Sequence, residues 1–215
     1  NLNVTGTLSN AGATVVTNFE TITANDTTTA VSITIDELTV ADGATLHVDG
    51  SSLTTAALTA NLADDSNGIN TVTGGGAGDS ITGSGSDQGD TLNGGAGNDT
   101  FTFATANFTS IDTIDGGDGT DIITFSNAET VEDADFTNVT NVETYTGFAG
   151  ASTIVLGPLA AAAGIVTVNT GGTAASTVTI PATHNADLTV VSQVAGETIA
   201  AAATYANKLT VKSTV

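Results

Sequence analysis

The chain has no cysteine, methionine or tryptophan, and only two of its 215 residues are lysine or arginine. Without cysteine, no disulfide bond can stabilise the fold. The scarcity of basic residues argues against nucleic acid and anionic membrane surfaces as partners, because contacts to phosphate depend on lysine and arginine. No apolar run approaches the roughly 20 residues of a transmembrane helix. The chain begins without Met and already in strand alternation, so we interpret it as part of a longer protein.

Acidic residues dominate the charge of the chain. With 23 Asp and Glu, the formal net charge is −21. Self-repulsion of this size destabilises a compact state unless cations neutralise it. Hydrophobic residues make up 40% of the chain but aromatic residues only 4%. This composition predicts a thin core, as in a solenoid, and the length allows one large all-β unit or two small ones.

The most informative stretch runs from Gly74 to Thr124 and contains a nine-residue pattern, G-G-x-G-x-D-x-U-x, in which U is apolar. This pattern is typical of calcium-binding β-helix repeats. Complete copies span Gly94 to Thr102 and Gly116 to Thr124. Two imperfect copies carry Ala77 and Gln88 in place of the third glycine.

The pattern has a physical basis. Its first six positions form a turn in which glycine supplies unusual backbone conformations and close approach. Its last three form a short strand whose central residue points into a thin core. The four expected core residues are Ile81, Leu92, Phe101 and Ile123. Stacked turns then offer carbonyl and carboxylate oxygens, the ligands that calcium prefers.

This block resembles the RTX (hemolysin-type calcium-binding repeat) family, whose successive turns lie on opposite edges of a parallel β-roll. The resemblance implies Ca²⁺ as cofactor, export in an unfolded state and folding in calcium. The implied carboxylate ligands are Asp79, Asp90, Asp99 and Asp121. The implied carbonyl donors are the turn residues around Gly75, Gly85, Gly94, Gly95, Gly97, Gly116, Gly117 and Gly119, and the auxiliary ligands are Asp87, Asn98, Asp112, Asp115 and Asp118.

We predict an all-β fold in three segments: a strand-rich segment (1–66), an RTX-like calcium-binding β-roll (67–126) and a second strand-rich segment (127–215). Apolar alternation predicts strands on both sides of the β-roll. The last segment suits either a β-sandwich or a continuation of the solenoid. Residues 51–62 suit either a short helix or solenoid turns. The alanine runs at 160–163 and 200–203 are each long enough for one helical turn.

An eight-residue sequence occurs twice. Val16 to Thr23 and Val139 to Thr146 share six identities at an offset of 123 residues. We interpret each copy as a strand of a tandem module, similar to strands in bacterial surface-layer proteins and giant adhesins; chance similarity in a threonine-rich chain is the alternative. Glu20 and Glu143 are candidate calcium ligands, with solvation or a hydrogen bond to a neighbouring turn as the commoner role.

Motifs of catalysis are missing from the sequence. His47 and His184 lack a second imidazole at metal-ligand spacing, and we expect both at the surface. There is no G-x-S-x-G nucleophile elbow and no phosphate-binding loop. Paired carboxylates would permit glycoside hydrolysis, but no tryptophan is present to stack a sugar. We therefore expect a protein that is not an enzyme.

Together these features predict a structural, calcium-binding, extracellular module at the bacterial cell surface. Its expected partners are copies of itself, in a surface layer or filament, with a surface glycan as a further partner and without nucleic acid or membrane insertion. One alternative is a repeat segment of an RTX adhesin that binds surfaces or glycans. Another is the accessory calcium domain of a secreted enzyme.

Overall fold

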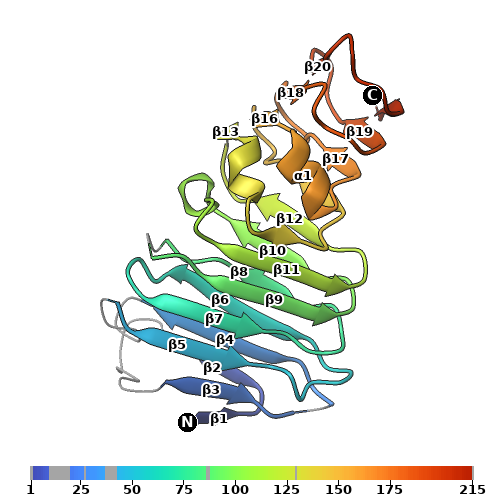
Figure 1. Cartoon of the computed structure of the whole chain (residues 1–215). Coiled ribbons are helices and arrows are strands. Elements are labelled where there is room, and N and C mark those ends of the chain that lie inside the picture. The colour runs from blue at the N-terminus through green and yellow to red at the C-terminus, as the bar shows by residue number, and fades with distance from the viewer. Residues whose placement is uncertain are drawn as a thin grey trace.

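The structure, a computed structural model, describes residues 2–9, 20–26, 28–36, 43–85, 88–128 and 130–214. The described chain forms a β-solenoid of about nine turns, with its two ends at opposite ends of the stack (Figure 1). All strand pairs among the described residues are parallel, so each coil adds one strand to each sheet that it crosses. The all-β solenoid fold is thereby confirmed.

Three parallel sheets run along the solenoid. Sheet A contains β1 (Leu2–Val4), β3 (Thr21–Ala24), β5 (Thr45–Asp49), β7 (Ile69–Thr73), β9 (Thr91–Ala96), β11 (Thr113–Asp118) and β14 (Val139–Thr140). Sheet B contains β2 (Thr7–Ser9), β4 (Val31–Asp36), β6 (Leu58–Asp64), β8 (Ser80–Thr82), β10 (Thr100–Phe103), β12 (Ile122–Phe125), β15 (Thr144–Thr146), β17 (Thr167–Asn169), β19 (Leu188–Ser192) and β21 (Leu209–Ser213). Sheet C contains β13 (Thr130–Val131), β16 (Thr153–Val155), β18 (Thr177–Ile180) and β20 (Thr198–Ala201).

The cross-section of the solenoid changes near its middle. Up to β12, strands alternate between sheets A and B, as in a two-sided roll. Sheet C then begins at β13 and sheet A ends at β14. In the next coil the helix α1 (Pro158–Ala163) contacts β14 and the 3-10 helix η2 (Asp133–Phe136). A second 3-10 helix, η1 (Thr105–Asn107), precedes β11. No helix in the described part of the chain is long and apolar enough to cross a membrane.

One apolar core runs through the described part of all three predicted segments. It is built by period-two alternation, so every second residue of a strand points inward. The four expected core residues of the repeats, Ile81, Leu92, Phe101 and Ile123, are all fully buried. Where the roll widens, the core is aromatic: Phe108 packs against Phe103, Phe125 and Phe136, with ring centroids 5.3 to 5.6 Å apart. In this part of the core, large rings take the place of the aliphatic side chains that fill the other coils.

The repeated eight-residue sequence is not one strand. Its second copy is divided between β14 in sheet A and β15 in sheet B. Between them Asn141 has a φ of +53°, a left-handed conformation that turns the chain through a corner. The described part of the first copy, from Glu20 to Thr23, enters β3 in sheet A. The two copies therefore occupy different positions in the coil, and the interpretation as equivalent strands was wrong.

The open alternatives are decided by the structure. Residues 51–56 form turns that lead into β6, without a helix. The alanine run at 160–163 is helical, whereas Ala200 and Ala201 belong to β20. The last segment continues the solenoid and is not a sandwich. Residues 16–19 of the first copy of the repeated sequence, and Asp87, lie outside the described residues.

Candidate functional site

Three repeat aspartates stack on one edge of the roll, one per coil. We call Asp79, Asp99, Asp121 and the following Glu143 the first ladder. The Asp79 N–H donates to Asp99 Oδ1 (2.6 Å), and the Asp99 N–H donates to Asp121 Oδ1 (2.7 Å). The Asp121 N–H in turn donates to Glu143 Oε2 (2.8 Å). Each carboxylate therefore ties its own coil to the preceding one.

The second carboxylate oxygens of this ladder are not equally satisfied. Asp79 Oδ2 accepts the Gly75 N–H at 2.6 Å. Asp99 Oδ2 and Asp121 Oδ2 are buried without a hydrogen-bond partner among the described residues. A buried acceptor that has lost its water costs about 1–3 kcal/mol, and more when it is charged. These two oxygens are therefore the strongest sign of a missing positive partner.

Backbone carbonyls approach the same two oxygens. A Cβ on Gly94 would overlap Asp99 Oδ2 and lie 2.6 Å from the carbonyl oxygen of Gly116, which belongs to the next coil. A Cβ on Gly116 would overlap the carbonyl oxygen of Asn141 and lie 2.6 Å from Asp121 Oδ2. Glycine at these positions therefore keeps open a space that a carboxylate and a carbonyl both border.

The turns that carry the ladder stack in register. Gly95 and Gly117 adopt positive φ angles of +102° and +94°, and each closely approaches the turn one coil below. Gly97 has a φ of +114° and lies against Ala77. Ala77 thus replaces glycine in a turn that still stacks with the complete repeats. The imperfect repeat keeps its place in the ladder although it departs from the sequence pattern.

Burial makes the three aspartates of the first ladder, Asp79, Asp99 and Asp121, hard to ionise in the absence of a cation. It raises the pKa of Asp99 to about 7, and the charges of Asp79 and Asp121 add to the effect. Burial also raises the pKa values of Asp79 and Asp121. A nearby positive charge would reverse these shifts, because it favours the ionised form.

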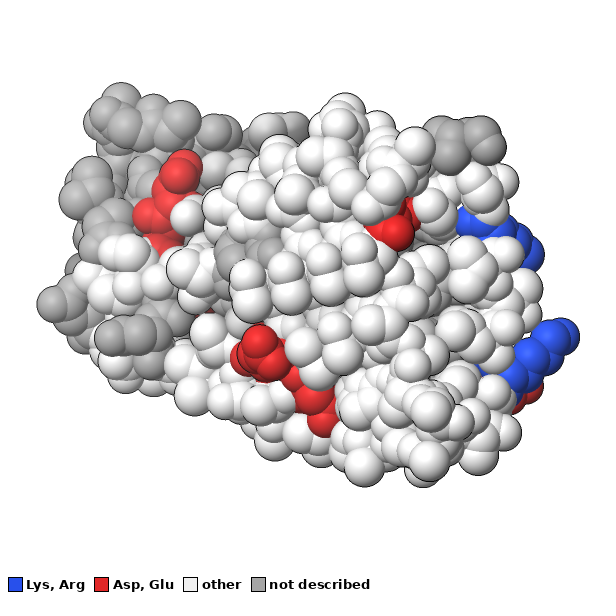
Figure 2. All heavy atoms as spheres, turned by 90° about the horizontal axis from the view of Figure 1, so that it is seen from above, with Lys and Arg blue, Asp and Glu red and all other residues white. Residues whose placement is uncertain are grey.

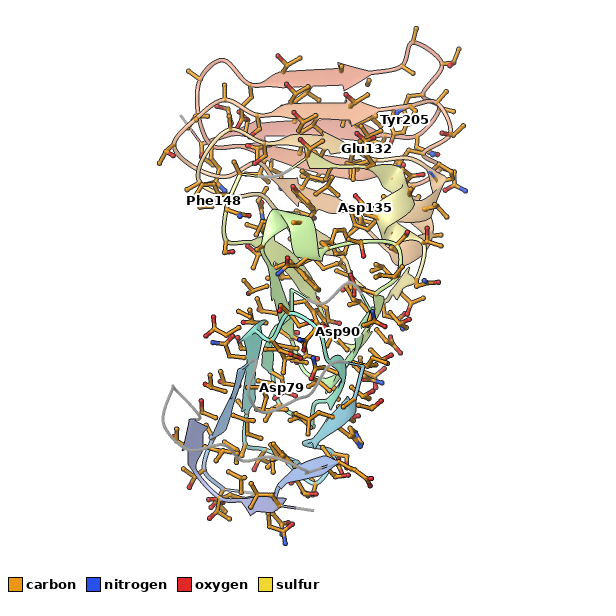
Figure 3. The ribbon with its side chains drawn as sticks, turned by 90° about the vertical axis from the view of Figure 1, so that its left-hand side faces the viewer. Asp79, Asp90, Glu132, Asp135, Phe148 and Tyr205 are labelled. Atoms are coloured by element: carbon orange, nitrogen blue, oxygen red, sulfur yellow. The ribbon has the colours of Figure 1, made fainter. Side chains whose placement is uncertain are left out.

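A second ladder lies where the intervening turns stack. The Asn70 N–H donates to Asp90 Oδ1 (3.1 Å), and the Asp90 N–H donates to Asp112 Oδ1 (3.0 Å). Asp90 Oδ2 accepts from the Ser84 N–H, and Asp112 Oδ2 accepts from the Thr109 N–H and hydroxyl. Successive aspartates therefore alternate between the two ladders. Asp79 and Asp90, one from each ladder, are labelled in Figure 3.

The two ladders differ in their need for a cation. Each carboxylate oxygen of Asp90 and Asp112 has a donor, so backbone and side-chain groups satisfy this edge. Burial still raises the pKa of Asp90. The first ladder therefore fits a cation at Asp99 and Asp121 better than the second ladder does.

Two buried residues of the second edge were missed by the sequence reasoning. Asp65 accepts from the Asn70 side-chain amide (2.6 Å) and the Gly68 N–H (3.3 Å), and burial raises its pKa. Asn70 Oδ1 is buried without a hydrogen-bond partner in the described structure. Neither residue belongs to a glycine-rich repeat; the only available signal was an aspartate about one coil before Asp90.

Most of the remaining expected ligands lie outside the first ladder. Asn98 Oδ1 accepts the Thr120 N–H, and Asp115 Oδ1 accepts from the Asn141 amide. Asp118 and Gly85 are exposed, and Asp87 is outside the described residues. Glu20 is exposed, whereas Glu143 ends the first ladder. Gly119 has a φ of +155° and stacks on Gly97.

His184 was expected at the surface, and that prediction was wrong. It is 1% exposed, with Nδ1 3.1 Å from the Gly157 carbonyl oxygen and the ring near Tyr205. Residue 184 lies in the turn between β18 and β19, and its side chain points into the solenoid.

Within the described ranges, no three His, Cys, Asp or Glu side chains gather closely enough to hold a metal ion. A cation at the first ladder would therefore depend on backbone carbonyls in addition to carboxylates. The residues present do fit such a cation, because Asp99 and Asp121 each offer a buried free oxygen beside a carbonyl. Carbonyl and carboxylate oxygens are calcium ligands.

A shallow groove of about 420 Å³ lies over sheet C. Its described lining consists of Ala128, Thr130, Ala151, Ser152, Thr153, Ala175 and Thr177. This lining has neither a charged nor an aromatic side chain, so the groove gives no argument for a sugar site.

Comparison with known proteins does not assign the chain to a group. It matches no family model, no curated protein and no solved structure.

Proposed function

We propose that this chain is a calcium-binding structural module of an extracellular bacterial assembly, of the RTX type. The observation that carries the proposal is the pair of buried oxygens on Asp99 and Asp121 that have no hydrogen-bond partner among the residues placed by the structure, each beside a carbonyl of the neighbouring coil. Calcium would supply the positive charge that these oxygens lack. Extracellular modules bind calcium with dissociation constants on the order of 10⁻⁴ to 10⁻³ M, which suit the calcium concentrations outside cells.

The ladder gives these residues a structural role. Asp99 and Asp121 join adjacent coils through their Oδ1 atoms while their Oδ2 atoms face the shared turn. Neutralising Oδ2 would remove the electrostatic cost of stacking the coils and leave the backbone hydrogen bonds intact. The middle of the solenoid would then become rigid only where calcium is present.

The open sheets support assembly with further copies. Among the described residues, β2 and β21 are the outermost strands of sheet B, and an outermost strand is a template for pairing with a further strand. Strand addition between copies would extend the parallel sheets along the solenoid axis. We therefore propose copies of this chain as its main partners, in a filament or surface layer.

The test is a comparison of folding in calcium, in magnesium and in chelator. Far-ultraviolet circular dichroism and the thermal midpoint should both rise with calcium in the millimolar range, and less with magnesium, which demands small octahedral sites. Identical spectra and midpoints in calcium and chelator would refute the calcium site. Sedimentation in calcium then tests assembly, and a monomer at high concentration would count against copies as partners.

A further inference from the structure

The outer face of sheet B carries two files of mainly small polar side chains. Each strand presents two outward residues, two positions apart, because side chains alternate across a strand. The strand registers align these residues from β2 to β21. Over the six middle coils the first file reads Thr59, Ser80, Thr100, Ile122, Thr144 and Thr167, and among these Thr144 is buried. The second file, two residues further along each strand, consists there of threonine and asparagine.

These files are nearly free of charge although the chain carries a net charge of −21. Among their described side chains, only Lys212 on β21 is charged, and Asp64 lies past the second file at the end of β6. Sheet A differs, because His47, Asp49 and Asp115 stand among its outward residues. Figure 2, seen from the C-terminal end, shows both blue lysines at one side of the molecule.

We propose that the outer face of sheet B is the lateral contact through which two copies of this chain pack against each other. The proposal rests on the proposed function, which already requires copies to assemble, and it names the surface they use. Two strongly acidic molecules repel each other unless they meet through surfaces without like charge. The long face of sheet B meets that condition, and it presents the same rows of methyl and hydroxyl groups to either copy.

The area of this face is small, so a stable assembly would need many such contacts side by side. Ten strands about 4.8 Å apart and about 12 Å of width give on the order of 500 Å² per copy, or about 1,000 Å² in total, the lower end of specific interfaces. A single pair of copies would therefore associate weakly. Strand pairing at the solenoid ends would multiply the same contact along a filament, which raises the overall avidity.

The test inserts a charge at the centre of the face. Thr102 lies in the second file on β10, and Thr113 lies on the outer face of sheet A on β11. Both are mid-sheet threonines in neighbouring strands along the chain, so Thr113→Lys is a matched control for Thr102→Lys. In calcium, we expect Thr102→Lys to raise the dissociation constant for lateral association about tenfold or more, because the contact would then bury an unpaired charge, and Thr113→Lys to leave it unchanged.

The readouts are sedimentation, filament width in electron micrographs and the calcium-dependent thermal midpoint of each variant. Loss of lateral association in Thr102→Lys, with the calcium response intact, supports the interface. Equal association of both variants overturns it and leaves the calcium proposal untouched. If wild type shapes ice crystals as a monomer, the hydroxyl rows order water instead, and the interface is likewise overturned. If Thr102→Lys loses its calcium response, the substitution has disturbed the fold. Thr124→Lys, in the second file on β12, then repeats the test.

Discussion

The Asp99 backbone N–H donates to Asp121 Oδ1 at 2.7 Å across one coil, while the Oδ2 atoms of both residues are buried and have no hydrogen-bond partner in the part of the chain that the structure describes. In each of these two carboxylates, Oδ1 accepts a hydrogen bond that stabilises the stack of coils, whereas the buried charge on Oδ2 destabilises it. This division explains how a ladder of like charges can both hold coils together and require a cation.

Replacing Asp99 by asparagine separates these two effects. The amide side chain keeps an oxygen for the Asp79 N–H and turns its NH₂ donor toward the carbonyl of Gly116. We expect Asp99→Asn to be at least as stable as wild type in chelator but to gain less stability from calcium, with affinity about tenfold lower, about 1.4 kcal/mol. Urea unfolding with and without calcium measures both quantities. Asp118→Asn, which changes an exposed carboxylate outside the ladder, is the control and should respond to calcium like wild type.

Metal-free stability should increase as the pH falls from 8 to 5. Burial raises the pKa of Asp99 from 3.8 to about 7, so the folded state keeps a proton that the unfolded chain has lost. The resulting stabilisation is complete below the unfolded pKa and is lost as the pH rises through 7. Urea midpoints in chelator measure the trend, and Asp99→Asn should flatten it. A wild-type midpoint that decreases from pH 8 to 5 would contradict the buried carboxylate.

Gly94→Ala should destabilise the roll by about 1–3 kcal/mol, because overpacking at a rigid backbone forces atoms apart. The new Cβ would overlap Asp99 Oδ2 and crowd the Gly116 carbonyl. Gly172→Ala is the control, since its Cβ would lie 3.5 Å from the Gln193 side chain, an ordinary contact. Thermal midpoints in calcium compare the two. Equal midpoints would show that the space beside Asp99 is not needed.

Phe108→Ala should cost about 3–5 kcal/mol, the usual penalty for a large cavity in a packed core. Its ring contacts three other aromatic rings close to the coil in which sheet A ends and sheet C begins. Phe148→Ala, which removes a partly buried ring outside this cluster, should cost less. Urea unfolding distinguishes the two variants. A similar loss in the free energy of unfolding for both would show that the aromatic cluster does not stabilise the core more than an ordinary ring does.

Asp133→Ala should destabilise the coils around α1 by about 0.5–2 kcal/mol, as expected for a lost helix cap. Its carboxylate accepts the N–H groups of Gly157 (2.7 Å) and Ala160 (2.9 Å) at the start of α1, from the coil before. Hydrogen exchange of α1 amides measures the local effect. Protection that is unchanged in the variant would rule out this cap.

The sequence predicted which turns carry the aspartates of the first ladder, but it did not predict every residue of the two ladders. Asp99 and Asp121 stand out because glycines precede them and a buried residue follows two positions later. Asp112 seemed auxiliary because no repeat surrounds it, yet it is the partner of Asp90. The ladder contacts join residues 20 to 22 positions apart, a spacing that is visible only once the coils are stacked.

By itself the sequence determined the parts of this protein that depend on local physics: alternating strands, a thin aliphatic core, glycine-rich turns and carboxylates at fixed places within them. Only the tertiary structure decided which turns stack, because coil length varies and register follows from packing of the whole core. It placed Glu143 at the end of the first ladder, buried His184 and divided the repeated sequence between two sheets. The unpartnered oxygens of Asp99 and Asp121 likewise exist only in the stack, since an isolated turn leaves both in water.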